Sequence, residues 1–104
     1  MISSTRDSTI SEKSIVVSVK NQVSSDLGGE AVILNMNTGT YHGLNEVGAR
    51  VWNLIEQPQV VKDIQQTLLQ EYEIESSVCS DDLLALLKDL QDAGLIEVKN
   101  ETTA

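Results

Sequence analysis

The hydrophobic pattern changes its period at Asn45, and this change constrains the fold more than any other feature of the chain. Before Asn45, residues 14–19 are dense in β-branched side chains and residues 30–36 are apolar on both faces, as expected of strands. After Asn45, apolar side chains recur three and four residues apart, which is the spacing of amphipathic helices. Strands followed by helices predict an α+β fold.

Three strands are predicted in the first part of the chain, and we expect them to form one three-stranded antiparallel sheet. The first strand has Ile15, Val17 and Val19 on one face. A loop over residues 24–29 separates it from the second strand. Gly39 can take the positive φ that a short hairpin loop requires. The predicted strands cover residues 14–19, 30–36 and 40–44.

Three helices are predicted after the sheet. Asn45 is a good N-cap for the first helix, which Pro58 ends. Gly94 suits the left-handed position that follows the third helix, where Leu95 can pack on Leu90 in a Schellman motif. The second and third helices cover about residues 60–72 and 78–93, and residues 96–98 add a short strand. This order of elements resembles a winged helix-turn-helix.

A chain of 104 residues has the length of one domain. Residues 1–13 and 99–104 are rich in Ser, Thr and charged side chains, and we expect them to be disordered tails around a domain at residues 14–98. The first residues lack the apolar core of a signal peptide, and no apolar run approaches the roughly 18 residues of a membrane span. We therefore expect a cytoplasmic protein that does not bind membranes.

The sequence contains few of the residues that commonly act in catalysis. His42 is the single histidine and Cys79 the single cysteine, so a catalytic triad or a metal site would lack members. His42 lies in a predicted strand, and Cys79 lies in line with apolar side chains of the third helix, so both are expected to be structural. We predict that the protein is not an enzyme, and that it has no catalytic residue, metal or cofactor.

The net charge of −9 is concentrated after residue 44, where twelve acidic residues outnumber four basic ones. The predicted third helix would repel a polyanion, and it has no arginine that could pair with guanine. A winged-helix regulator that binds DNA stays an alternative function, although this charge disfavours binding to nucleic acid. The charged residues of the helix are Asp81, Asp82, Lys88, Asp89 and Asp92.

The third helix is apolar over a wider surface than a core stripe needs. On a helical wheel, Leu84 and Leu87 lie together on one flank of the stripe, near Gln91. This flank either packs under a loop or forms the wall of a groove. If residues 40–44 lie at a sheet edge beside it, their free N–H and C=O groups can accept a further strand by β-augmentation. The predicted core stripe is Cys79, Leu83, Leu86 and Leu90, and the opposite flank carries Asp82, Asp89 and Ala93.

Residues 37–52 carry a family motif. Their sequence, NTGTYHGLNEVGARVW, is similar to the pattern tG-x-Y-x-x-LN-x-x-G-x-x-hW of PqqD-like proteins. The resemblance covers about residues 14–98. Further matches lie in the second and third helices and after them, at residues 61–64, Leu68, Tyr72, Asp82, Leu83, Leu86, Leu87, Leu90 and 94–96.

PqqD-like proteins, also called RiPP recognition elements, are small winged-helix domains without catalytic activity. The resemblance implies that the chain binds the leader segment of a ribosomally made precursor peptide and presents it to a modifying enzyme. It also implies that the leader adds as a strand to the third strand, beside the third helix, although the motif leaves open which flank of the helix faces the leader. By position, the docking strand would be Thr40, Tyr41, His42, Gly43 and Leu44, and the wall would be Leu83, Leu84, Leu87 and Gln91.

Freestanding domains of this family work in more than one pathway. Those of the pyrroloquinoline-quinone pathway work with a radical SAM enzyme, and those of lasso-peptide pathways work with a leader peptidase. The lasso-peptide type is the one that we expect here. Besides the DNA-binding regulator, an adaptor that binds a folded protein without any leader stays an alternative function.

Overall fold

The computed structural model describes residues 10–20 and 22–99. Of the predicted tails, residues 1–9 and 100–104 lie outside this described part. Residues 10–13 contact the rest of the chain, since Ile10 packs against the core and the N–H of Lys62 donates a 3.0 Å hydrogen bond to the carbonyl of Glu12. In this described part the architecture is α+β, with three helices and antiparallel sheets.

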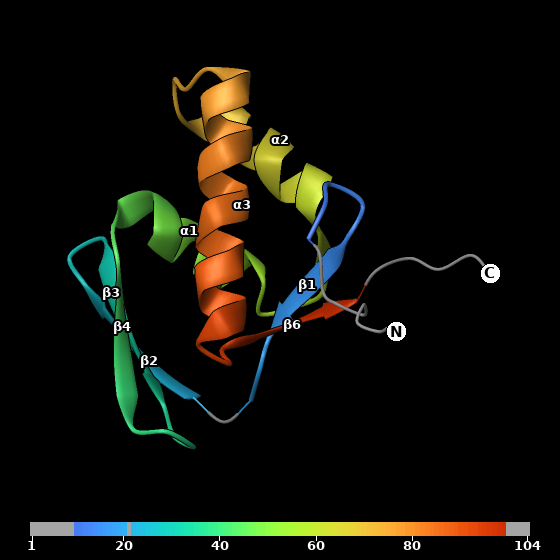
Figure 1. Cartoon of the computed structure of the whole chain (residues 1–104). Helices are drawn as coiled ribbons and strands as arrows, with labels where there is room; N and C mark the ends of the chain where they lie inside the picture. Colours follow the sequence, from blue (N-terminus) through green and yellow to red (C-terminus); the bar gives the residue numbers. More distant parts are fainter. Residues whose placement is uncertain (1–9, 21, 100–104) are drawn as a thin grey trace, which may run out of the picture.

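One antiparallel sheet has the order β2-β3-β4 and consists of β2 (Gln22–Leu27), β3 (Glu30–Asn35) and β4 (Thr40–Leu44) (Figure 1). The loop predicted over residues 24–29 is therefore wrong, because these residues belong largely to β2. Ser24 and Ser25 are exposed, so β2 shows no apolar alternation and is held by its hydrogen bonds to β3. The hairpin between β3 and β4 turns through Gly39, whose φ of 74° confirms the predicted left-handed conformation.

The other antiparallel sheet has the order β5-β1-β6 and consists of β5 (Gln59–Val60), β1 (Ile15–Ser18) and β6 (Ile96–Lys99). The prediction that the first strand joins the hairpin sheet is wrong, because β1 pairs with β5 and β6 instead. The face is also reversed, since Val16 is the fully buried residue of β1. An apolar strand pattern indicates burial but does not identify the pairing partner. The predicted strand at residues 96–98 is confirmed as β6.

The three predicted helices are α1 (Glu46–Leu54), α2 (Val61–Glu71) and α3 (Ser76–Asp92). Asn45 caps α1 as predicted, because its Oδ1 accepts a 2.9 Å hydrogen bond from the N–H of Gly48. The observed α2 and α3 agree with the predicted ranges within two residues at each end. In the described part of the chain, no helix is long and apolar enough to cross a membrane.

The end of α3 forms the predicted Schellman motif. The N–H of Leu95 donates to the carbonyl of Leu90 at 2.9 Å, and the N–H of Gly94 donates to the carbonyl of Gln91 at 3.0 Å. Gly94 has a φ of 73°, in the left-handed region that the motif requires. The chain therefore reverses sharply after α3 and enters β6.

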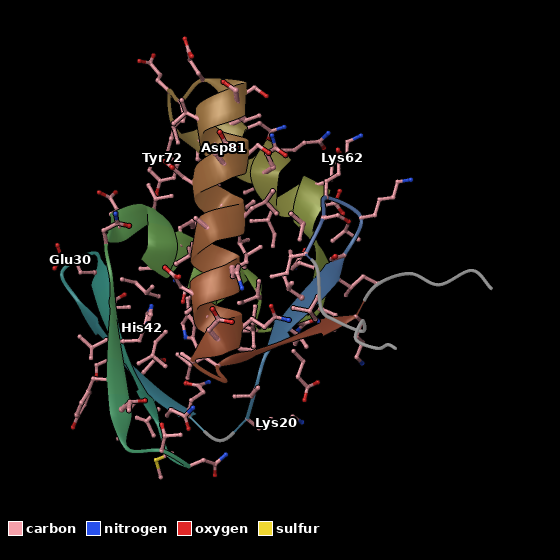
Figure 2. All side chains as sticks on the ribbon, viewed as in Figure 1. Lys20, Glu30, His42, Lys62, Tyr72 and Asp81 are labelled. Carbon is pink, nitrogen blue, oxygen red and sulfur yellow. The ribbon has the colours of Figure 1, made fainter. Side chains whose placement is uncertain are left out.

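Helix α3 lies between the two sheets, with the hairpin sheet on one side and the β1–β6 pair on the other (Figure 1). Its Leu87 and Leu90 are fully buried. Figure 2 shows Asp81 on the surface of α3, whereas His42 extends from β4 towards α3. The central helix therefore has one side in the core and another side facing β4.

Candidate binding groove

Strand β4 is an edge strand. It pairs with β3 from Ala31↔Leu44 to Asn35↔Thr40, and within residues 10–20 and 22–99 no strand pairs with its other side. An antiparallel edge strand directs the N–H and C=O groups of alternate residues outwards. The condition that residues 40–44 lie at a sheet edge is therefore met in the described part of the chain, and β4 has backbone groups that can accept another strand.

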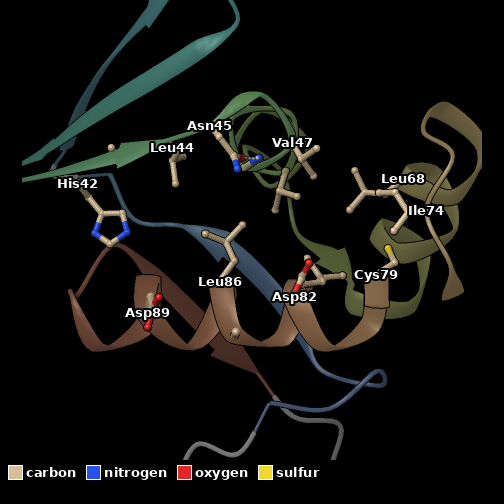
Figure 3. Close-up of a pocket in the computed structure, with 15 residues that line it drawn as sticks. His42, Leu44, Asn45, Val47, Leu68, Ile74, Cys79, Asp82, Leu86 and Asp89 are labelled. Atoms are coloured by element: carbon tan, nitrogen blue, oxygen red, sulfur yellow. Dashed lines mark hydrogen bonds between the residues drawn. The ribbon is translucent and has the colours of Figure 1, made fainter. Parts of the chain in front are cut away.

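A groove lies between β4 and α3 (Figure 3). Its cavity has a volume of about 460 Å³. Strand β4 forms one wall, α3 forms the other, and the beginning of α1 lies at the floor. The lining residues are His42, Gly43, Leu44, Asn45, Val47, Gly48, Val51, Leu68, Ile74, Cys79, Asp82, Leu83, Ala85, Leu86 and Asp89.

One end of the groove is apolar. Leu68 of α2, Ile74 of the following linker and Cys79 of α3 meet there (Figure 3). Burial raises the pKa of the Cys79 thiol, and the charge of Asp82 raises it further. The thiol therefore stays protonated at neutral pH and acts as a small apolar side chain.

The other end of the groove is polar. His42 of β4 and Asp89 of α3 lie opposite one another there (Figure 3). Leu86 and Asp82 follow along α3 towards the apolar end. The α3 wall thus presents an apolar side chain between two carboxylates.

Local structure holds the two walls in place. Because α1 starts directly after β4, the cap at Asn45 fixes the position at which Val47 and Val51 enter the floor. At the far end of the hairpin, the side chain of Asn35 donates a 2.8 Å hydrogen bond to the carbonyl of Ala93, just after α3. One end of the hairpin is therefore fixed to α1 and the other end to the residue that follows α3.

The structure brings together part of the predicted site. His42, Gly43 and Leu44 line the groove from β4, and Leu83 lines it from α3. Thr40 and Tyr41 belong to β4 but do not line the cavity, and the Tyr41 side chain is 72% exposed.

The predicted wall residues Leu84, Leu87 and Gln91 do not line the groove. Leu87 is fully buried in the core, and the groove is lined from the opposite flank of α3. Their predicted contact with a peptide therefore has no support from the geometry of the groove. The physical reason is that α3 packs apolar side chains on both flanks, so its own pattern does not distinguish the flank that faces β4.

Several lining residues were not among the predicted site residues, and two kinds of signal could have found them. Asp82, Leu86 and Asp89 are spaced four and three residues apart, so they share a helix face. Val47 and Val51 lie inside the motif segment, one turn apart on α1. Both signals become specific to the site only once the packing of α3 against β4 is known.

The described residues show no arrangement suited to metal binding. Within residues 10–20 and 22–99, no three His, Cys, Asp or Glu side chains gather as potential ligands. The surface of α3 is acidic, because Asp81, Asp82 and Asp89 are exposed and Lys88 is paired with Asp92 at 3.5 Å. Such a helix is unsuited to the phosphates of nucleic acid.

Comparison with known families identifies the family of this chain. The family described as Coenzyme PQQ synthesis protein D (PqqD) matches residues 30–96. This range contains the β3–β4 hairpin, the three helices and the first residue of β6. No curated protein matches the chain significantly.

Two solved structures have a similar fold. The first, of TbiB1 in complex with the TbiA(beta) leader peptide, has a TM-score of 0.72 and 32% sequence identity, and the match covers 78% of this chain and 94% of that chain. The second, of lasso peptide synthetase B1 complexed with the leader peptide, has a TM-score of 0.69 and 23% identity, with 79% and 96% of the two chains covered. At that identity the second likeness concerns the fold alone.

Proposed function

The chain belongs to the PqqD family, and we propose that it binds the leader segment of a ribosomally made precursor peptide as a strand added to β4. The observation that carries this proposal is the free edge of β4 beside an open groove. The similarity to TbiB1, which was solved with a leader peptide, supports it. Within this proposal we prefer the lasso-peptide type to the pyrroloquinoline-quinone type, because lasso peptide synthetase B1, solved with the leader peptide, has the same fold.

The added strand is held in two ways. Main-chain hydrogen bonds to β4 provide affinity for any extended peptide, and side chains that enter the groove provide selectivity. Residues of a strand alternate between its faces, so every second side chain of the leader faces α3. A short strand buries a small interface, so the affinity depends on how well these side chains fill the groove.

The docking strand of this proposal is β4, with the predicted residues Thr40, Tyr41, His42, Gly43 and Leu44. Leu83 stays in the proposed wall, because it lines the groove. The rest of the proposed wall consists of Asp82, Leu86 and Asp89. They replace the predicted wall residues Leu84, Leu87 and Gln91.

The proposed role is to hold a peptide and not to react with it. Binding of the leader raises the effective concentration of the attached core peptide at a partner enzyme. For the lasso-peptide type, that partner is a leader peptidase. The packing of α2, α3 and the β5-β1-β6 sheet supports the winged helix-turn-helix description, used here for a peptide and not for DNA.

Titration of the leader tests this proposal. Inspection of the neighbouring genes for a short precursor reading frame identifies the probe, which is the leader peptide of that precursor labelled with fluorescein, and the control is the same peptide with its sequence scrambled. We expect saturable binding of the leader and no binding of the scrambled peptide. Changes in amide NMR shifts should be concentrated on β4 and on the groove wall of α3. Absence of leader binding, or equal binding of the scrambled peptide, would contradict the proposal.

A further inference from the structure

The α3 wall of the groove carries negative charge that the described chain does not neutralise. Asp82 and Asp89 both line the cavity, and no Lys or Arg is among its lining residues. Neither carboxylate forms an ion pair within residues 10–20 and 22–99. Two cations of the neighbouring helices are already paired elsewhere, since Arg50 of α1 binds Glu71 and Lys88 of α3 binds Asp92.

The two carboxylates flank an apolar side chain. Leu86 lies four residues after Asp82 and three residues before Asp89, and all three residues line the same cavity. At a helical rise of about 1.5 Å per residue, the carboxylates are roughly 10 Å apart along the helix axis. The α3 wall therefore presents an acidic, an apolar and an acidic position in succession (Figure 3).

A strand beside β4 has a comparable spacing. Side chains on one face of a strand recur about every 6.6 Å, so three successive positions of that face span about 13 Å. The span of these three strand positions is only slightly longer than the distance between the two carboxylates on α3, and long Lys or Arg side chains can bridge the difference. Positions i, i+2 and i+4 of a guest strand can therefore lie near Asp82, Leu86 and Asp89, in either chain direction.

We propose that the guest of this groove is a strand that carries Lys or Arg at positions i and i+4 and an apolar residue at i+2, facing α3. This inference rests on the proposed function and specifies the class of leader that the site selects. Charge complementarity with Asp82 and Asp89 supports it, because an acidic leader would face two uncompensated carboxylates in the same wall. The pattern is symmetric, so it applies to parallel and to antiparallel addition.

The experiment combines variants of the protein with variants of the peptide. The first protein variant is the double substitution Asp82→Asn/Asp89→Asn. The control is Asp81→Asn, a single charge change on the same helix at an exposed residue outside the groove lining. The probes are the labelled leader encoded beside the gene and the same leader with the basic residues of its i and i+4 positions replaced by Gln. Circular dichroism confirms that each protein variant is folded.

We expect the double variant to bind the leader about tenfold more weakly, and the Gln leader to lose a similar factor with the wild-type protein. The double variant and the Gln leader, when combined, should lose little more affinity than either change alone, because both changes remove the same ion pairs. The affinity of wild-type protein should fall with added salt, and Asp81→Asn should bind as wild type does.

Four results would overturn the inference. A leader that lacks the pattern, or full affinity of the double variant for the leader, would exclude the charge pairing while the proposed function stands. Strictly additive losses would show that the carboxylates and the basic residues do not meet. Absence of leader binding by the wild-type protein would instead refute the proposed function, and the inference with it.

Discussion

The side chain of Asn35 joins the end of β3 to the carbonyl of Ala93, the residue that follows α3. Its Nδ2 donates a 2.8 Å hydrogen bond to that oxygen, and its Oδ1 accepts a 2.8 Å hydrogen bond from the N–H of Asn37 in the hairpin turn. Asn35 is 3% exposed. One side chain therefore satisfies a helix-end carbonyl and holds the hairpin against α3.

Replacement of Asn35 by Ala should lower the free energy of unfolding by about 1–3 kcal/mol, because it leaves polar groups without partners at a partly buried site. Urea denaturation followed by circular dichroism measures this change. Asn35→Asp is the matched variant, since it keeps the acceptor for Asn37 and removes the donor to Ala93. Wild-type stability of the Asp variant would show that the bond to Ala93 does not hold the hairpin.

Proline in β4 should separate binding from folding. Adjacent residues of a strand direct their N–H groups to opposite sides, so either Tyr41 or His42 has its N–H at the open edge. The variant that removes this edge N–H should stay folded and bind the leader about three- to tenfold more weakly. The other variant removes a hydrogen bond to β3 and should be less stable. If both Tyr41→Pro and His42→Pro fold and bind as wild type does, β4 is not the docking strand.

Truncation of Leu86 and Leu84 compares the two flanks of α3. Both side chains are half-buried and pack against the core, but only Leu86 is among the residues that line the groove. Leu86→Ala should therefore weaken leader binding about fivefold, whereas Leu84→Ala should leave it unchanged. Fluorescence anisotropy titration measures both. The opposite outcome would place the leader on the Leu84 flank that the helical wheel first indicated.

The ion pair between Arg50 of α1 and Glu71 at the end of α2 should make stability depend on pH. The guanidinium donates to both carboxylate oxygens at 2.8 Å, and this hydrogen bonding lowers the pKa of Glu71 below its ordinary value of 4.5. A lowered pKa in the folded state stabilises the protein above the unfolded value, and this stabilisation is lost as the pH falls through the folded value.

Glu71→Gln should accordingly have a lower Tm than wild type at pH 7, and the difference should decrease as the pH falls below 4.5. Thermal unfolding across this pH range provides the measurement. Because the pair is exposed, the difference should also decrease in high salt. A difference that is unchanged at low pH would mean that the ion pair is not its cause.

Cys79 should react slowly with iodoacetamide, because its side chain is 3% exposed and burial raises the pKa of its thiol. The rate should increase with pH up to 9 and should increase strongly in urea, where the thiol is free. Since Cys79 lines the apolar end of the groove, addition of the leader should slow the reaction further. Labelling followed by mass spectrometry measures these rates. A rate in native buffer equal to the rate in urea would contradict the burial of this residue.

Features set by neighbouring residues could be predicted from the sequence. The cap at Asn45 and the Schellman turn at Gly94 depend on hydrogen bonds within one helix end, and both occur as expected. The turn between β3 and β4 depends on the positive φ of Gly39, which also occurs as expected. In each case the determining contacts lie within a few residues along the chain.

Features set by distant contacts could not be predicted in the same way. Strand β1 was expected beside the hairpin, yet its partners are β5 and β6, which lie far along the chain. Residues 23–26 of β2 are exposed and are mostly polar, so their sequence resembles a loop and only the pairing with β3 makes this segment a strand. The flank of α3 that faces the groove also depends on a distant contact, the position of β4. Leu86 was expected in the core and Leu87 in the groove wall, whereas Leu86 lines the groove and Leu87 is buried in the core.

The acidic wall beside β4 also affects how copies of this chain behave towards one another. Strand β4 has the sequence TYHGL, which contains neither lysine nor proline, the residues that commonly prevent edge-to-edge aggregation. A second copy that paired with β4 would bring its own net charge of −9 towards Asp82 and Asp89. Repulsion between the two polyanions opposes such pairing at neutral pH, and this opposition should weaken as the pH approaches the pI of about 4.3.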